Sequence, residues 1–192
     1  MKLRKDAVTD KAILPVIRER YSPRAFSPEV PEKEVLERLF EAARWTPSAM
    51  NDQPWSFYVG IKGEGVFYDH LFSSLVDFNQ KWAYQAPVLI LIAGNSISNK
   101  TKQENKAFRY DCGQAAAFLS LQAMHEKLYI HQMGGFDTNI VKEKFNLEDK
   151  LEAFVILALG YLGDAESLSP PFDEMEKTPR QRKEQADFVL WG

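Results

Sequence analysis

Apolar residues recur at helical spacing in several separate stretches of the chain. Residues 32–44 are a clear case, because Val35, Leu36, Leu39 and Ala43 fall on one face of a helix that follows a proline. A helix of this kind buries its apolar face and leaves its polar face in water. The same spacing predicts helices over residues 8–20, 32–44, 66–82, 104–128 and 138–145.

Other stretches carry the patterns of strands. Residues 88–93 form a continuous apolar run, typical of a strand buried on both faces, whereas residues 55–61 alternate. The sequence predicts strands over residues 55–61, 88–93, 153–161 and 186–191, and the last has little of its own chain left to pack on. Because these elements do not alternate as βαβ units, their order predicts an α+β fold with one sheet covered by helices.

Composition and charge narrow the class of protein. A chain of 192 residues with 45% hydrophobic residues suits a single domain over residues 1–192. The net charge of −3 argues against nucleic acid as a partner, and no GxGxxG motif follows a strand to mark a Rossmann cofactor site. Cys112 is the single cysteine, which excludes an internal disulfide and a cysteine-rich metal site.

The chain shows no metal-binding motif and no targeting segment. His70, His125 and His131 are scattered along the sequence, so we expect no bound metal. The N-terminus lacks the apolar core of a secretion signal, and no apolar run reaches the length of a membrane span. We therefore expect a cytoplasmic protein with no membrane partner.

The loop between the second predicted helix and the first predicted strand is rich in polar groups. Its prolines, Pro47 and Pro54, exclude both a helix and a central strand. Between them, Ser48, Asn51 and Gln53 supply neutral donors and acceptors that suit the edge of a flat heterocycle. On residue types alone, a polar loop shaped by turn-forming residues is the simpler interpretation.

Two basic clusters lie far apart in the sequence. Arg20, Ser22 and Arg24 stand at the end of the first predicted helix and could clamp a phosphate, although basic residues are also favoured there by the helix dipole. Arg180 and Arg182 alternate, so in an extended segment they point the same way. The alternative is a solvated basic run that balances the acidic residues before it.

Two adjacent glycines precede the predicted helix at 138–145. Gly134 and Gly135 would let backbone N–H groups approach a ligand closely. A plain turn between two elements is the commoner explanation for such a pair. Each of these clusters is therefore ambiguous when it is taken alone.

Taken in order, the clusters resemble those of a known family. An Arg-Tyr-Ser-Pro-Arg segment is followed by Pro-Ser-x-x-Asn-x-Gln-Pro-Trp, a small-residue helix around residues 112–119, a Gly-Phe-Asp turn and a late Arg-x-Arg. This order resembles the FMN-dependent nitroreductase family, which includes NAD(P)H nitroreductases and flavin-reductase-like proteins. The resemblance runs from Arg20 to the C-terminal tail.

The resemblance implies an assembly as well as a fold. It implies an α+β fold and an intertwined homodimer, with the small-residue helix at the dimer interface. The C-terminal arm, about residues 178–192, would reach the partner subunit and exchange its strand there. Two FMN molecules would lie at the interface, each contacted by both chains.

The resemblance also implies roles for individual residues. Arg20 and Ser22 would hold the phosphate and ribityl end together with Arg180 and Arg182, while Arg24 would lie near the pyrimidine edge and favour the anionic reduced flavin. The 46–54 loop would reach the flavin from the opposite subunit, and Gly134 and Gly135 would present backbone N–H groups to it. The full implied set of cofactor-binding residues is Arg20, Tyr21, Ser22, Arg24, Pro47, Ser48, Ala49, Asn51, Gln53, Asn79, Gln132, Met133, Gly134, Gly135, Arg180 and Arg182.

The chain departs from the family pattern in three places. Gln132 to Gly135 replace a Pro-x-Glu-Gly turn, which keeps the backbone donor and loses the acidic side chain. Lys81 and Trp82 stand where many members carry a lysine near the flavin, and whether Lys81 takes that role stays open. Residues 96–104 leave little room for the substrate-covering helices of some members.

The implied activity is that of an FMN oxidoreductase. NADH or NADPH would pass hydride through flavin N5 to a quinone, a nitroaromatic compound or a similar small aromatic acceptor. The cofactor would carry the chemistry, so no side chain is assigned as catalytic. Two alternatives stay open: a flavin-fragmenting or dehalogenating relative, and a non-catalytic flavin-binding or redox-sensing protein.

Overall fold

A four-stranded antiparallel sheet forms the centre of the protein, as seen in a computed structural model that describes residues 3–192. The strand order is β1-β2-β4-β3, and every neighbouring pair is antiparallel. The strands are β1 (Trp55–Ile61), β2 (Val88–Asn95), β3 (Leu128–Met133) and β4 (Leu151–Tyr161). Every residue of β2 is buried, as its continuous apolar sequence predicts.

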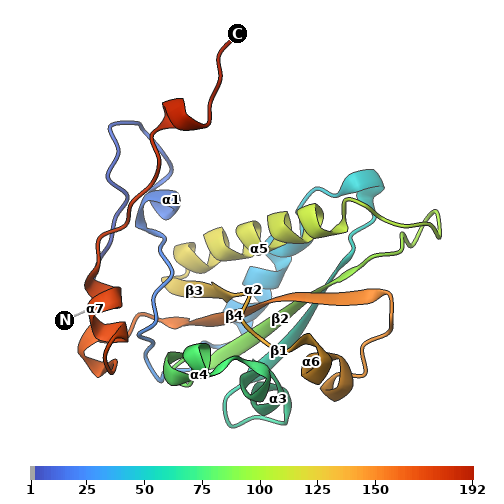
Figure 1. Cartoon of the computed structure of the whole chain (residues 1–192), viewed down its shortest axis with the longest axis horizontal. Coiled ribbons are helices and arrows are strands. Elements are labelled where there is room, and N and C mark those ends of the chain that lie inside the picture. Colours follow the sequence, from blue (N-terminus) through green and yellow to red (C-terminus); the bar gives the residue numbers. More distant parts are fainter. Residues whose placement is uncertain (1–2) are drawn as a thin grey trace.

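Helices cover both faces of this sheet (Figure 1). One face is covered by α2 (Lys33–Arg44) and α5 (Phe108–His125), and the other by α3 (Phe67–Ser74), α4 (Asp77–Ala83) and α6 (Thr138–Lys144). Consecutive residues of β2 serve opposite faces, because side chains alternate along a strand. Ile90 and Ile92 pack with α2 and α5, whereas Leu89 and Leu91 pack with the helices of the other face.

Two arms lie side by side at one edge of this core (Figure 1). The N-terminal arm, residues 3–14, leads into the short helix α1 (Pro15–Glu19), and the C-terminal arm, residues 178–192, follows α7 (Phe172–Lys177). Shorter 3-10 turns are η1 (Ala49–Asn51), η2 (Ala165–Ser167) and η3 (Gln185–Asp187). Among the helices of residues 3–192, none combines the length and apolar character needed to cross a membrane.

The predicted α+β class is confirmed, together with most of its elements. Residues 32–44 form α2 with Glu32 as the cap, and residues 55–61 form β1. The predicted strand at 88–93 lies inside β2, and the one at 153–161 lies inside β4. The helices predicted at 104–128 and 138–145 are present in shorter form as α5 and α6.

The helix predicted over residues 8–20 is largely wrong. Only the five residues of α1 are helical, and Pro15 is the first of them. Proline lacks the N–H of a helix interior and forces the preceding residue into an extended conformation, as Leu14 shows with ψ 137°. The apolar stripe of Ile13, Leu14 and Ile17 consequently lies exposed in this chain instead of packing on its sheet.

The prediction of a single helix over residues 66–82 is also wrong, because the helix is interrupted between α3 and α4. Leu75 is extended and forms a β-bridge with Phe136. The Val76 N–H donates to the carbonyl of Gly135 at 3.1 Å, and the Asp137 N–H donates to the carbonyl of Ser74. Long-range backbone pairing with the turn after β3 therefore overrides the local helical pattern.

The strand predicted over residues 186–191 does not form within this chain, and its exchange with a partner subunit stays a prediction. Residues 186–191 contain the end of η3 and then a segment without strand pairing, in which Phe188, Leu190 and Trp191 are 64%, 93% and 91% exposed. Among residues 3–192, no strand pairing involves this segment. The fourth strand is instead β3, which pairs antiparallel with β4.

The acidic, proline-rich stretch at 167–177 contains a buried helix face. Phe172 and Glu176 of α7 are both 2% exposed. They stand four residues apart and therefore share one side of the helix. The acidic and proline-rich composition of the segment conceals this spacing.

Candidate functional site

Arginines of the C-terminal arm meet Arg20 at the end of α1. Arg20 is the C-terminal cap of α1, and the Arg180 guanidinium donates hydrogen bonds to the carbonyls of Arg20 and Arg18, the latter at 2.9 Å. Arg20 Nη1 lies 3.3 Å from Ser22 Oγ. Together with Arg182, these side chains form what we call the arginine cluster: Arg20, Ser22, Arg180 and Arg182.

The arginine cluster is a region of concentrated positive charge. Burial and the neighbouring Arg180 and Arg182 lower the pKa of Arg20. Burial and Arg182 also lower the pKa of Arg180, and the carboxylate of Asp6 opposes that shift. Within residues 3–192, none of the three arginines forms an ion pair, and Arg180 Nε is buried without a hydrogen-bond partner. An anion placed among them would relieve the repulsion and satisfy the free donors.

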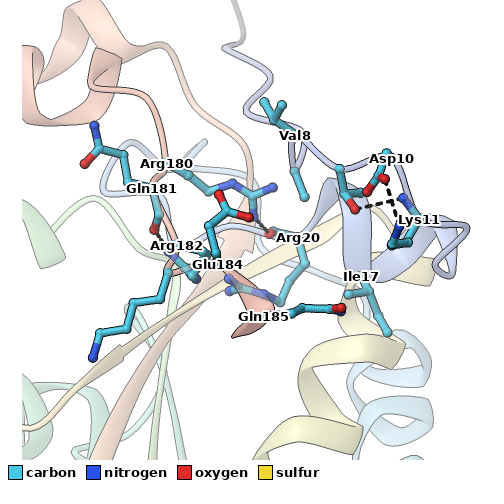
Figure 2. Close-up of a pocket in the computed structure, with 13 residues that line it drawn as sticks. Val8, Asp10, Lys11, Ile17, Arg20, Arg180, Gln181, Arg182, Glu184 and Gln185 are labelled. Atoms are coloured by element: carbon cyan, nitrogen blue, oxygen red, sulfur yellow. Dashed lines mark hydrogen bonds and ion pairs between the residues drawn. The ribbon is translucent and has the colours of Figure 1, made fainter. Parts of the chain in front are cut away.

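A cavity of about 860 Å³ opens beside the arginine cluster, between the two arms. Its walls are residues 7–11 of the N-terminal arm, Ile17 and Arg20 of the α1 region, and residues 180–185 of the C-terminal arm. Figure 2 shows the side chains of Arg20, Arg180 and Arg182 gathered around it. A phosphate group could therefore enter from solvent and reach all three guanidinium groups.

Arg24 lies just beyond this cluster, against buried aromatic side chains. Its guanidinium carbon lies 5.9 Å from the centre of the Trp82 ring, and its Nε is buried with no hydrogen-bond partner among residues 3–192. Burial lowers the pKa of Arg24, and the carboxylate of Glu176 opposes that shift. Tyr21 in the same turn is buried and donates its hydroxyl to the carbonyl of Leu3 at 2.8 Å.

His131 holds the turn that carries Arg24. Its Nδ1 lies 2.8 Å from the carbonyl of Pro23, which makes Nδ1 the protonated nitrogen, and its ring centre lies 4.5 Å from that of Trp82. Burial lowers the pKa of His131 to about 4, so the imidazole is neutral at neutral pH. This hydrogen bond connects β3 to Pro23, the residue before Arg24. No sequence motif predicts the contact.

The 46–54 loop is folded by its own polar groups. Ser48 Oγ accepts the backbone N–H of Gln53 at 3.0 Å, and Gln53 Nε2 donates to Asn51 Oδ1 at 3.1 Å. Met50, Asn51 and Gln53 all have positive φ, between 50° and 54°, a conformation that costs free energy in non-glycine residues. The side chains of Asn51 and Gln53 are exposed, so both are free to contact a ligand.

Two buried carboxylates anchor this loop to the start of α5. Asp52 is 7% exposed and accepts hydrogen bonds from Ser98 Oγ at 2.9 Å and Asn105 Nδ2 at 3.1 Å. Asp111 is 2% exposed and accepts the backbone N–H of Ala49 at 3.1 Å. Sequence reasoning missed both anchors, because the partners of Asp52 lie 46 and 53 residues away.

The predicted glycine turn lies against α4. Asn79 Nδ2 donates to the carbonyl of Gly135 at 3.0 Å, and a Cβ at Gly135 would stand 3.0 Å from both that nitrogen and Val76 Cγ2. Gly134 has open space around it. Gln132 is exposed, whereas the side chain of Met133 is 2% exposed and belongs to the core. Lys81 is exposed beside the buried Trp82.

The 46–54 loop and the arginine cluster lie at opposite ends of α5 (Figure 1). The loop contacts Asp111 in the first turn of α5, while β3, which follows the last turn, packs on the turn before Arg24. The 18 residues of α5 span about 27 Å. One chain therefore brings Arg20, Ser22, Arg180 and Arg182 together and keeps Ser48, Asn51 and Gln53 away from them.

The fold and site define an α+β protein with an arginine-lined cavity beside its arms, and comparisons with known proteins identify its family. A sequence profile described as the Nitroreductase family matches residues 17–69 and 61–161. A crystal structure described as an oxidoreductase containing FMN superposes with a TM-score of 0.91 at 30% identity, over 100% of this chain and 98% of that one. The chain therefore belongs to the nitroreductase family and is an oxidoreductase.

Two further relatives extend the comparison. A nitroreductase family protein from Clostridium difficile 630 is 26% identical with a TM-score of 0.71, over 92% of this chain and 95% of that one. An uncharacterized 15.4 kDa protein from Mycolicibacterium smegmatis is 30% identical over 126 residues, which is 62% of this chain and 82% of that protein.

Proposed function

We propose that this protein is an FMN-dependent oxidoreductase that takes hydride from NADH or NADPH and reduces a quinone, a nitroaromatic compound or a similar flat acceptor. The observation that carries the proposal is the arginine cluster, in which Arg20, Arg180 and Arg182 gather beside a cavity of a nitroreductase fold without an ion pair among residues 3–192. A relative that is 30% identical is described as containing FMN.

The residues of the cluster fit the phosphate of FMN. Arg20, Arg180 and Arg182 offer guanidinium donors, and Ser22 adds a hydroxyl within reach of Arg20. Hydrogen bonds to charged groups contribute roughly 1.5–3 kcal/mol each. Two such bonds would favour the phosphorylated cofactor by about a hundredfold or more over the unphosphorylated form.

Bound FMN would supply the redox chemistry by accepting and donating hydride. The chain's own residues bind and orient the ring. Arg24 would place a positive charge near the pyrimidine edge, where it stabilises negative charge. Asn79 fixes the turn that carries Gly134 and Gly135, whose backbone N–H groups would face the other edge of the ring.

We propose a homodimer in which each cofactor site draws on both chains. The length of α5 separates the two halves of the site within one chain, so a second chain must supply the 46–54 loop. Exposed apolar groups support such a contact: Tyr110 and Phe118 on the outer face of α5 are 73% and 40% exposed. Phe188, Leu190 and Trp191 of the C-terminal arm would dock on the partner.

Cofactor preference provides the first test. The purified protein is expected to be yellow with one FMN per subunit, and titration followed by quenching of flavin fluorescence should show much tighter binding of FMN than of riboflavin. Equal affinities for the two flavins would contradict the role of the arginine cluster.

Turnover provides the second test. Addition of NADH or NADPH without oxygen should bleach the absorption of the bound flavin, and a quinone should restore it. Bleaching by neither nucleotide would indicate a flavin-binding protein without this activity. Permanent loss of the flavin spectrum under oxygen would indicate a flavin-fragmenting enzyme instead.

A further inference from the structure

Glu176 is a buried carboxylate beside the proposed cofactor site. It lies on the inner face of α7 and is 2% exposed. Its Oε2 accepts the backbone N–H of Arg24 at 2.9 Å, and its backbone carbonyl accepts the ammonium of Lys5 at 2.7 Å. Glu176 therefore links α7, the N-terminal arm and the turn that carries Arg24.

The groups that face Glu176 are Lys5, Tyr21 and Arg24. Burial raises the pKa of Glu176 above the usual range, while the positive charges of Lys5 and Arg24 and the backbone N–H groups of Arg24 and Ala25 oppose that shift. Burial and then Glu176 itself raise the pKa of Tyr21. The carboxylate thus stands between two cations and a neutral phenol, where its charge is poorly screened by water.

Glu176 does not neutralise Arg24 through a direct ion pair. Glu176 Oε1 and Arg24 Nε are both buried without a hydrogen-bond partner among residues 3–192, and no ion pair joins the two residues. The Arg24 guanidinium stays positively charged and has no ion-pair partner in the described part of the chain. The Glu176 carboxylate lies close enough to offset part of that positive charge. The two groups are electrostatically coupled and each retains free hydrogen-bonding capacity.

A purely structural link would not need this charge. An amide or a hydroxyl can accept the Arg24 N–H without the cost of burying a carboxylate. Ionisable groups that are strongly perturbed by burial and by one charged partner concentrate at functional sites. Glu176 accepts the backbone N–H of Arg24, a residue proposed to contact the flavin. The negative charge of Glu176 can therefore act on that arginine.

Resting on the proposed function, we propose that Glu176 is a positioning residue of the flavin site. Its carboxylate fixes the backbone at Arg24 and, acting through that arginine, limits how strongly its charge favours the reduced, anionic cofactor. Glu176 thereby sets the redox potential of the bound flavin below the value that Arg24 alone would give.

The Glu176→Gln variant tests this inference, because glutamine keeps an oxygen acceptor for the Arg24 N–H and removes the charge. We expect FMN at the wild-type stoichiometry and a midpoint potential shifted to higher values, measured by spectroelectrochemistry. Glu174→Gln is the matched control, since Glu174 lies on the exposed face of the same helix. In an Arg24→Ala background, the Glu176→Gln shift should shrink.

An unchanged potential in Glu176→Gln with full FMN occupancy would overturn the inference, as would an equal shift in Glu174→Gln. If Glu176→Gln fails to fold, Glu176→Met provides a second neutral side chain of similar length with the same expected shift. Failure of both neutral variants, while Glu176→Asp folds and binds FMN, would assign the carboxylate a purely structural role. A wild-type protein that binds no FMN would overturn the proposed function and this inference with it.

Discussion

The 46–54 loop and the arginine cluster form two contrasting halves of the proposed site. The loop is held by buried acceptors, Asp52 and Asp111, that tie it to the start of α5. The cluster is built from the end of α1 and the C-terminal arm, outside the sheet, and its arginines repel one another. The loop is therefore organised in the absence of a ligand, whereas the cluster needs an anion to complete it.

This difference predicts different consequences when each half is damaged. Loss of the arms removes charge that binds the phosphate, and it also removes apolar surface that we expect to cover the partner chain. Loss of a loop anchor leaves the phosphate site intact and releases side chains from the conformation in which they would meet the ring. Measurements of FMN binding, of dimer formation and of the flavin midpoint potential should therefore distinguish the contributions of the two halves.

Truncation after Lys177 should have the largest effect. It removes Arg180, Arg182 and the apolar tail but leaves all four strands, so circular dichroism should report a folded core. We expect loss of bound FMN and dissociation of the dimer, measured by absorbance and analytical ultracentrifugation. Truncation after Asp187 is the matched control: it should weaken the dimer and retain the arginines. Full FMN binding after the longer truncation would contradict the account.

Asp52→Ala should have the next largest effect, on the loop half alone. It leaves the hydroxyl of Ser98 and the amide of Asn105 without their buried acceptor, which costs roughly 1–3 kcal/mol. We expect FMN to bind about tenfold or more weakly in fluorescence titrations, because the loop no longer holds its shape. Asp69→Ala, at an exposed position of α3, is the control and should bind FMN like the wild type.

Arg24→Ala should change the midpoint potential of the bound FMN more than the amount of FMN that binds. Removing this charge withdraws a stabilising interaction on the order of 1 kcal/mol or more from the reduced flavin, so the midpoint potential should fall. Arg24→Lys retains the charge and should stay near the wild-type potential. A fully occupied Arg24→Ala protein with an unchanged potential would show that Arg24 does not act on the flavin.

His131 should have the smallest effect on the cofactor site itself, and should give a pH dependence of stability instead. Its pKa is lowered to about 4 in the folded protein from an ordinary value of 6.5, so below pH 6.5 the unfolded chain binds the extra proton. The free energy of unfolding should therefore fall as the pH drops from about 6.5 to about 4, by at most roughly 3 kcal/mol. His131→Gln should flatten this dependence in urea unfolding, whereas His125→Gln, at an exposed position, should not.

The sequence predicts those elements whose hydrophobic pattern lies entirely within their own residues. β2 is a continuous apolar run and α2 has a clean apolar face, so both are found where expected. The helix at 8–20 fails because Pro15 starts a short helix where a longer one is expected. β3 was missed because its pairing with β4 is not encoded in its own residues.

The candidate site divides in the same way. The polar residues of the loop and the paired arginines carry recognisable motifs, so they could be proposed before the structure was known. Asp52 and Glu176 could not, because each acts through a partner more than 40 residues away, and Glu176 meets Arg24 across 152 residues. Buried carboxylates of this kind become visible only when the fold brings their partners together.

The central claim is that each cofactor site is completed by two chains, and mixing two defective variants tests it most directly. One variant carries Asn51→Ala and Gln53→Ala, and the other carries Arg20→Ala and Ser22→Ala. Half of the dimers formed on co-refolding are mixed, and each mixed dimer has one intact site, so about a quarter of wild-type FMN binding and activity should return. No recovery, with mixed dimers verified by mass spectrometry, would show that both halves serve the flavin of one chain and would contradict the account.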